Sequence, residues 1–156
     1  MRNCLLALCL IAGAAAWGAA AAQAAVPVEV KDAWVRAPAP GQKVAGAYME
    51  LLSRTHLALI SVASPAAARV ELHSTAIEDG VMKMRPVDRV ELPAGKAVKL
   101  EPGGLHVMLI DLRQPLQPEA KVPLTLTLQR ADFSRVIFTL QAEVRSAPAA
   151  QANHRH

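Results

Sequence analysis

The stretch RVELHSTAIEDGVMKMRPV (residues 69–87) predicts a β-hairpin around Asp79-Gly80. Asp-Gly is the preferred pair for a type I′ turn, because both central residues of that turn need positive φ. A two-residue loop then fixes which residues of the two strands face each other. Directly opposed residues share one face of a hairpin, and so do residues two apart along a strand. We therefore expect His73 and Met84 on one face as diagonal neighbours, about 7–8 Å apart along the backbone.

Outside the hairpin, the chain shows short alternating runs broken by Pro, Gly and Asp, and it shows no convincing amphipathic helix. Many short strands with turn signals between them are typical of a β-sandwich or barrel. We therefore predict an all-β fold with Trp34 and Tyr48 in its core and a first strand interrupted near Asp32. The predicted strands cover residues 26–35, 44–52, 57–62, 69–77, 81–87, 90–92, 97–100, 105–112, 123–129 and 135–144.

The N-terminus has the three parts of a secretory signal peptide. Arg2 gives a short basic start, residues 5–22 form an apolar run rich in Ala and Leu, and Ala22-Gln23-Ala24 is a small-x-small cleavage site. We therefore predict that residues 1–24 are a signal peptide and that the mature chain has no membrane span. A retained membrane anchor is the alternative, but the run is barely long enough to cross a bilayer and its many alanines make it weakly apolar.

Both cysteines, Cys4 and Cys9, lie inside the predicted signal peptide. We therefore expect the mature chain to have no disulfide, no thiolate metal site and no thiol nucleophile. Lipidation of Cys9 is disfavoured, because the bulky Leu8 stands where a lipoprotein signal has a small residue. A metal protein exported without cysteines has to bind its metal through His, Met or carboxylate side chains.

The 132 residues after the predicted signal fit one domain, which we place at residues 25–145. Residues 146–156 are small and polar, and we expect them to form a disordered tail. Without Arg2 the chain has 16 basic and 13 acidic residues, and these charges are scattered along it. Nucleic-acid binding requires a clustered basic patch with aromatic residues. Because aromatic residues make up only 3% of the chain, this class of function is disfavoured.

Two His–Met pairs occur at separations suited to one metal site. His73 is followed after ten intervening residues by Met84, and twenty-one further residues precede a His-x-Met pair, His106 and Met108. The members of this second pair are two apart on a predicted strand, so they share a face. The spacing does not itself bring this strand to the hairpin, although a sandwich can bring distant strands together at its ends. Each residue alone is more often structural, but four of them in two same-face pairs favour a metal site.

Imidazole nitrogen and thioether sulfur are suitable ligands for copper in a compartment where thiols are oxidised. Soft sulfur ligands select Cu(I), and imidazole suits copper in either oxidation state. Because all four ligands are neutral, the site keeps only the charge of the ion itself, which favours Cu(I) over Cu(II). Such ligands release a metal by exchange more easily than thiolates do. The pattern therefore favours a copper carrier over a permanent store.

These residues lie in a chain that resembles the PCu(A)C family of periplasmic copper chaperones. The family motif H-(M)-x10-M-x21-H-x-M falls on His73, Met84, His106 and Met108 with both spacings intact. The resemblance covers nearly all of the mature domain up to about Val144. The matching flanks are AWVRAPAPGQKVAGAYM (33–49), ARVELH (68–73), EDGVMKMRPV (78–87), LPAGKAV (92–98) and PGGLHVMLIDLRQPL (102–116).

The resemblance implies a cupredoxin-like, Greek-key β-sandwich that binds Cu(I) through those four side chains. It also implies delivery of copper in the periplasm towards cytochrome c oxidase assembly, with an oxidase subunit or a Sco-type thiol protein as partner. We predict a monomeric metallochaperone. Many relatives have extra methionines just after the first histidine, whereas residues 74–77 contain no sulfur here. Met82 could serve as a reserve ligand, although packing is its simpler role.

The C-terminus adds a second candidate metal site. Some relatives have His- and Met-rich tails that bind Cu(II). This chain ends in His154-Arg155-His156, and imidazole suits the cupric ion. Two histidines are few, so a solvated tail without metal is the alternative.

Three other functions stay open on the sequence alone. A copper sequestration or resistance protein would use the same site without passing copper on. A copper oxidase or monooxygenase would need a site that is stable in both oxidation states and has an open position. The methionines argue against that site, so we predict that the chain is not an enzyme. A structural β-sandwich without metal would fail to bind Cu(I).

Overall fold

The computed structural model describes residues 26–146. The predicted signal peptide and the residues from 147 onward, including His154 and His156, lie outside the described residues. Within 26–146 there is no helix that could cross a membrane. All regular secondary structure in that range is β-strand, as predicted. The strands are β1 (Val28–Arg36), β2 (Val44–Ser53), β3 (Leu57–Ala63), β4 (Ala67–Glu78), β5 (Val81–Pro86), β6 (Val90–Leu92), β7 (Ala97–Leu100), β8 (Leu105–Leu112), β9 (Lys121–Arg130) and β10 (Arg135–Arg145).

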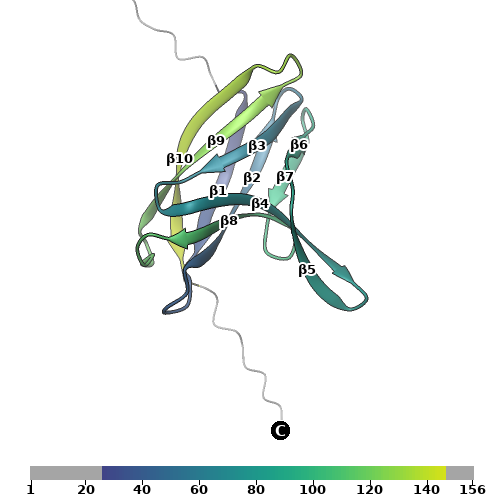
Figure 1. Cartoon of the computed structure of the whole chain (residues 1–156). Helices are drawn as coiled ribbons and strands as arrows, with labels where there is room; N and C mark the ends of the chain where they lie inside the picture. Colours follow the sequence, from purple (N-terminus) through teal and green to yellow (C-terminus); the bar gives the residue numbers. More distant parts are fainter. Residues whose placement is uncertain (1–25, 147–156) are drawn as a thin grey trace, which may run out of the picture.

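The strands form one hydrogen-bonded path that folds back on itself. Its order is β5-β4-β8-β2-β1-β10-β9-β3-β6, and β7 pairs with β2. In Figure 1 strands β3 and β9 lie over β1 and β2, so the inner faces of the two layers meet. Two strands that are far apart in sequence, β4 and β8, become neighbours along this path. That neighbourhood determines where the candidate metal ligands lie.

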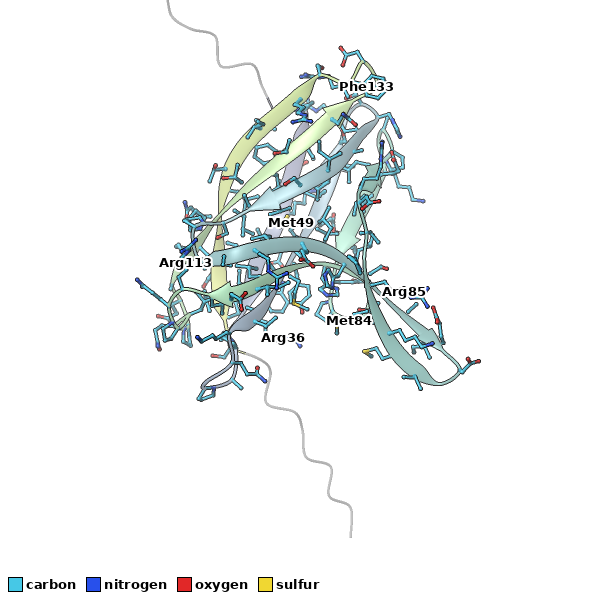
Figure 2. The ribbon with its side chains drawn as sticks, viewed as in Figure 1. Arg36, Met49, Met84, Arg85, Arg113 and Phe133 are labelled. Carbon is cyan, nitrogen blue, oxygen red and sulfur yellow. The ribbon has the colours of Figure 1, made fainter. Side chains whose placement is uncertain are left out.

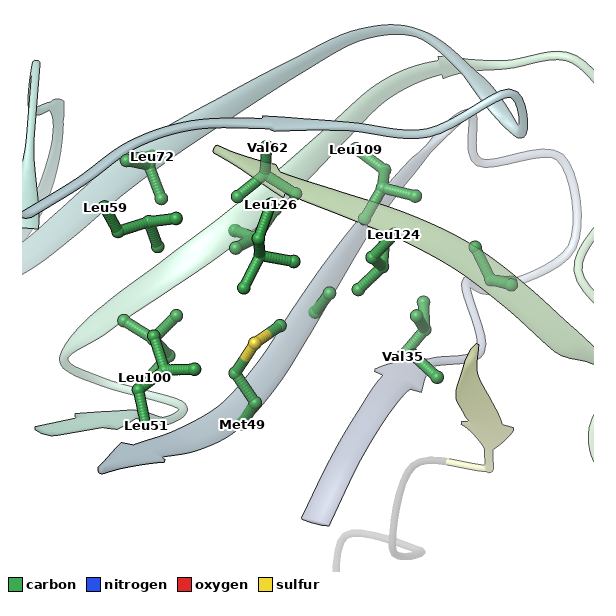
Figure 3. Close-up of a cluster of buried hydrophobic side chains, with 14 of the residues drawn as sticks. Val35, Met49, Leu51, Leu59, Val62, Leu72, Leu100, Leu109, Leu124 and Leu126 are labelled. Carbon is green, nitrogen blue, oxygen red and sulfur yellow. The ribbon is translucent and has the colours of Figure 1, made fainter. Parts of the chain in front are cut away.

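Apolar side chains from both layers fill the space between them. On β9 the residues Val122, Leu124, Leu126 and Leu128 alternate with more exposed residues and are each at most 2% exposed. Figure 3 shows Leu124 and Leu126 of this row facing Met49 of the opposite layer. Burying one such side chain contributes about 1.5–3 kcal/mol. The sandwich is therefore held together by apolar packing between its two layers.

Strand β1 is interrupted where the sequence predicted it. Asp32 has a φ of 47°, and the pairing register of β1 with β2 shifts between Lys31 and Trp34. An extra residue of this kind bends a strand and increases its twist. The Asp32 carboxylate accepts a hydrogen bond from Arg145 at 2.7 Å, which ties the bulge to the end of β10. Beyond the bulge, Trp34 pairs directly with Tyr48.

The β4–β5 hairpin forms with the predicted register, in which Thr75 pairs with Met84. Asp79 and Gly80 have φ of 52° and 77°, the two positive values of a type I′ turn. Figure 1 shows the hairpin projecting from the body of the sandwich. Every residue of β5 is exposed. The hairpin therefore presents its side chains to solvent and to the adjacent end of the domain.

The two faces of the hairpin differ in chemistry. On one face, the Glu78 carboxylate accepts hydrogen bonds from Lys83 at 3.0 Å and from Arg85 at 2.8 Å. The other face is apolar, and its Ile77 and Met82 side chains are 74% and 60% exposed. The face that carries the candidate metal ligand is thus the apolar one.

Two predicted strands begin earlier than expected. Strand β4 begins at Ala67 and not at Arg69, and β9 begins at Lys121 and not at Pro123. Pro123 lies inside β9, but it has a neighbouring strand on one side only. It pairs with Gln141 of β10, whereas the pairing of β9 with β3 starts at Thr125. A proline is tolerated in a strand where its missing amide faces no partner strand. The alternating pattern alone did not reveal this partial edge.

We expect Gly80→Ala to loosen the hairpin without unfolding the domain. The positive φ of Gly80 costs an L-residue about 1–2 kcal/mol, while the space around its Cα is open. Amide hydrogen exchange in β5 should therefore speed up by roughly tenfold, with a smaller change in the thermal unfolding of the sandwich.

The matched control is Gly104→Ala, because Gly104 has no positive φ and a Cβ there meets only ordinary contacts at 3.7 Å or more. Unchanged exchange in β5 of the Gly80 variant would show that the turn does not set the hairpin's stability.

Candidate metal centre

Pairing of β4 with β8 places the two histidines of the motif opposite each other. The strands are antiparallel, His73 is the register partner of His106, and the ring centroids lie 5.8 Å apart. The preceding pair in the ladder, Leu72 and Val107, faces the core. The histidines therefore lie on the outer face of the sandwich. The sequence did not indicate this pairing, which makes the two strands direct neighbours and not merely strands that meet at one end.

The tautomer of His106 leaves its Nε2 atom free to bind a metal. The residue is only 4% exposed, and its Nδ1 lies 3.0 Å from the carbonyl oxygen of Gly104. Because a carbonyl can only accept, Nδ1 carries the hydrogen and donates it. Nε2 then holds the lone pair. A metal-binding histidine is commonly oriented in this way, by a hydrogen bond from its other nitrogen.

His73 is oriented by a carboxylate, and its second nitrogen has no partner. Its Nε2 lies 2.9 Å from Glu71 Oε2, so Nε2–H donates to the carboxylate. Its Nδ1 atom is buried and has no hydrogen-bond partner among the described residues. A buried polar atom without a partner is uncommon and costly. A metal ion bound at Nδ1 would remove that cost.

Both predicted methionine ligands line one open cleft with His106. The cleft has a volume of about 840 Å³, and Met82 and Tyr48 also line it. Met84 is 54% exposed, whereas Met108 is half-buried. In Figure 2 Met84 lies beside the hairpin, on the side that faces the body of the domain. Three of the four predicted ligands thus share a cleft, and the fourth, His73, adjoins it through its contact with the His106 ring.

Tyr48 is buried at 8% exposed, as predicted, and it also belongs to this site, whereas Trp34, which we predicted in the core, is only half-buried. The Tyr48 ring centroid lies 6.4 Å from that of His106 and 4.6 Å from that of Trp34. The ring lies over Gly46, where its Cζ atom is 2.9 Å from the position a Cβ would occupy. Gly46 is also the register partner of Met108. The Gly46-x-Tyr48 spacing was the signal available in the sequence. Residues two apart share a strand face, and a glycine leaves a gap on that face that the tyrosine ring can cover.

A guanidinium group closes the aromatic side of the cleft. The Arg36 side chain lies 5.5 Å from the Tyr48 ring centroid and 6.0 Å from that of Trp34. A cation over an aromatic face is attracted by the ring. The Nε atom of Arg36 is buried and lacks a hydrogen-bond partner in residues 26–146. Arg145 lies on the same aromatic cluster, and its hydrogen bond with Asp32 raises the pKa of Arg145.

The donor atoms at the cleft are imidazole nitrogens and thioether sulfurs. Within residues 26–146 no three His, Cys, Asp or Glu side chains gather into a metal-binding group. Oxygen-rich sites suit Mg²⁺ and Ca²⁺, whereas thioethers suit soft ions. The cleft is therefore suited to a soft cation. His154 and His156, the candidate ligands of the tail, lie outside the described residues.

The LpqE-like family model, described as "Putative lipoprotein LpqE-like", matches residues 28–139. The chain belongs to this PCu(A)C-type family. One relative, "Putative lipoprotein Lxx21020" from Leifsonia xyli subsp. xyli, is 31% identical over 110 residues. That alignment covers 70% of this chain and 66% of the relative, slightly less than two thirds of its length.

Solved structures of PCu(A)C domains have the same fold. The copper-bound PCuAC domain from PmoF2 is 25% identical with a TM-score of 0.63, over 80% of this chain and 97% of that domain. Apo-DR1885 from Deinococcus radiodurans is 31% identical with a TM-score of 0.60, over 94% and 97% of the two chains. Its Cu(I) form is 33% identical with a TM-score of 0.53, over 81% and 83%. The predicted cupredoxin-like β-sandwich is thus confirmed.

We expect Gly46→Ala to destabilise this PCu(A)C-type domain by about 1–3 kcal/mol, the usual cost of overpacking. The new Cβ would overlap the Tyr48 hydroxyl, and Tyr48 is held between Trp34 and Arg36. Urea unfolding measures the change.

The same substitution in a Tyr48→Leu background should cost much less, because the overlapping atoms are then gone. An equal cost in both backgrounds would mean that Tyr48 is not the obstacle.

Proposed function

We propose that this chain is an envelope copper carrier that binds one Cu(I) ion through His73, Met84, His106 and Met108. The observation that carries the proposal is the paired histidines, each with one nitrogen fixed by a hydrogen bond and the other available, beside a cleft lined by both predicted methionine ligands. Two imidazoles and two thioethers are a ligand set for monovalent copper.

The relatives support copper as the ion. One neighbouring PCuAC domain is a copper-bound form, and the Deinococcus protein has a Cu(I) form. The charge at the cleft supports the monovalent state, because Arg36 and Lys43 line it and no carboxylate does. Repulsion by a fixed positive charge is greater for a divalent than for a monovalent ion.

The exposure of the ligands supports carriage over catalysis or storage. His106 is buried, whereas Met84 is more than half exposed on a projecting hairpin. A receiving protein could therefore displace the outer thioether first, while the imidazoles still hold the ion. Sequestration would use the same four ligands, but storage would gain from a covered site. Carriage needs no turnover, so we propose no enzymatic activity.

The location and the partner follow from the family resemblance. The predicted signal peptide supports a periplasmic location, and a relative named as a lipoprotein supports an envelope location. Lipid attachment at Cys9 of this chain remains disfavoured by Leu8. We propose that the monomer delivers copper towards cytochrome c oxidase assembly, to an oxidase subunit or a Sco-type thiol protein. The tail histidines, His154 and His156, are a proposed secondary Cu(II) site.

We expect the parent protein to bind one Cu(I) tightly in competition with a chromogenic chelator. Each ligand variant, His73→Ala, Met84→Leu, His106→Ala and Met108→Leu, should lose at least roughly tenfold in affinity, because each removes one of four donor atoms.

Met49→Leu is the matched control, since Met49 is buried in the core at 3% exposure and the change conserves volume. Met82→Leu reports whether the reserve ligand contributes. A parent that does not bind, or ligand variants that bind as tightly as Met49→Leu, would refute the proposed site.

We expect Glu71→Ala to weaken Cu(I) binding by about 10–100-fold, although Glu71 is not itself a ligand. Its carboxylate holds the hydrogen of His73 Nε2 and so keeps Nδ1 free for the metal. Glu71→Gln keeps an acceptor oxygen and should lose less. Chelator competition measures both variants.

Glu78→Ala is the matched control, because it also removes a carboxylate, one that pairs with Lys83 and Arg85 and touches neither histidine. We expect it to change the affinity by less than about threefold. Equal losses for Glu71→Ala and Glu78→Ala would show that charge, and not orientation of His73, is responsible.

A further inference from the structure

We propose that the end of the domain beside the cleft docks an acidic surface of the protein that receives the copper. The docking surface, here termed the cationic rim, consists of Arg36, Lys43 and Arg113. The proposal rests on the proposed copper-carrier function and adds the chemistry of the partner to it.

The three cations of the rim carry charges that no ion pair among the described residues neutralises. Within residues 26–146 none of the three makes an ion pair, whereas Lys83 and Arg85 on the hairpin both pair with Glu78. Lys43 and Arg113 are exposed, and Arg36 is half-buried. Unpaired charges on one surface produce a field that a partner of opposite sign can use.

Two adjoining clefts make the rim continuous with the candidate metal centre. Lys43 lines both the ligand cleft and a second cleft of about 560 Å³ between residues 37–43 and 112–118. Arg36 lines the first of these clefts and Arg113 the second, and neither lining contains Asp or Glu. Figure 2 places Arg36 and Met84 at the end of the domain opposite Phe133, with Arg113 on the same half as Arg36.

The rim is bordered by apolar surface that a protein could cover. Prolines and Leu116 line the second cleft, and the hairpin presents Ile77 and Met82 at 74% and 60% exposure. Interfaces commonly combine an apolar centre with a charged border. A partner segment with carboxylates around an apolar or sulfur-bearing centre therefore fits this end of the domain.

An acidic protein fits the rim better than an anionic membrane does. Membrane recognition by charge typically uses clusters of about 4–8 Lys or Arg residues, more than the rim provides. The rim also borders two concave clefts, which suit a protruding protein segment. Complementary charge speeds encounter and orients the partners, and this effect weakens as salt is added.

The test measures Cu(I) transfer from the loaded full-length protein to synthetic acceptor peptides. One peptide carries a Met- and His-containing Cu(I) site flanked by Asp residues, and the matched peptide has Asn at those positions. At low ionic strength we expect transfer to the Asp peptide to be roughly tenfold faster, with the ratio falling towards one at high salt. The preference should disappear in the double variant Lys43→Gln, Arg113→Gln.

The matched control is the double variant Lys96→Gln, Arg135→Gln. Both residues are exposed cations without an ion pair in the described part of the chain, and both lie near strand ends remote from the rim. This variant has the same net charge as the rim variant, and it should keep the preference for the Asp peptide. Loss of the preference in both double variants would mean that only net charge matters, which overturns the docking proposal.

Chelator competition on the same preparations separates the two proposals. If the parent does not bind Cu(I), the copper-carrier function fails. If it binds Cu(I) but transfers it equally fast to both peptides, only the docking proposal fails. Binding of the parent to vesicles with anionic lipids, lost in the rim variant and unaccompanied by any peptide preference, would assign the rim to a membrane and also overturn the proposal.

Discussion

Antiparallel pairing of β4 with β8 is the constraint on which the candidate site depends. In this ladder the pair Leu72 and Val107 faces the core, and the next pair, His73 and His106, faces outward. Side chains alternate between faces along a strand, so a slip of β4 by one residue would move His73 into the core and expose Leu72. The packing that stabilises the sandwich therefore also holds the two imidazoles at one register. Stability and site geometry are set by the same hydrogen-bonded ladder.

The two kinds of ligand are held very differently. Each histidine is fixed by a hydrogen bond from one nitrogen, to Glu71 for His73 and to the Gly104 carbonyl for His106. By contrast, Met84 lies on a hairpin whose second strand is exposed throughout. The nitrogen side of the site is thus preorganised by partly buried backbone and carboxylate contacts, whereas the Met84 sulfur is on an exposed strand and Met108 is half-buried. This asymmetry suits a carrier, because an incoming ligand can reach the Met84 sulfur without disturbing the fold.

Local features were predictable from the sequence, whereas contacts between distant segments were not. The Asp79-Gly80 turn fixed the face that carries Met84, because a two-residue loop leaves one register and side chains alternate with period two. The same alternation showed that His106 points away from the core. It contained no information about the partner of β8, so the approach of the two histidines required the folded chain. The burial of Tyr48 was predictable, because aromatic residues in strands are usually buried, but its place beside the ligands was not, because only the bare backbone of Gly46 lets its ring reach the cleft.

Positive charge beside a site for a positive ion needs a physical reason. Arg36 and Lys43 oppose any cation in the cleft, and this opposition grows with the charge of the ion. In the proposed function the cost is smallest for Cu(I), so the cations act against Cu(II) and limit how tightly the cargo is held. A carboxylate brought close by a partner would neutralise the same groups. The charge that restrains binding in the free protein is therefore also the charge that favours an acidic recipient, and both effects follow from a cleft whose lining contains no carboxylate.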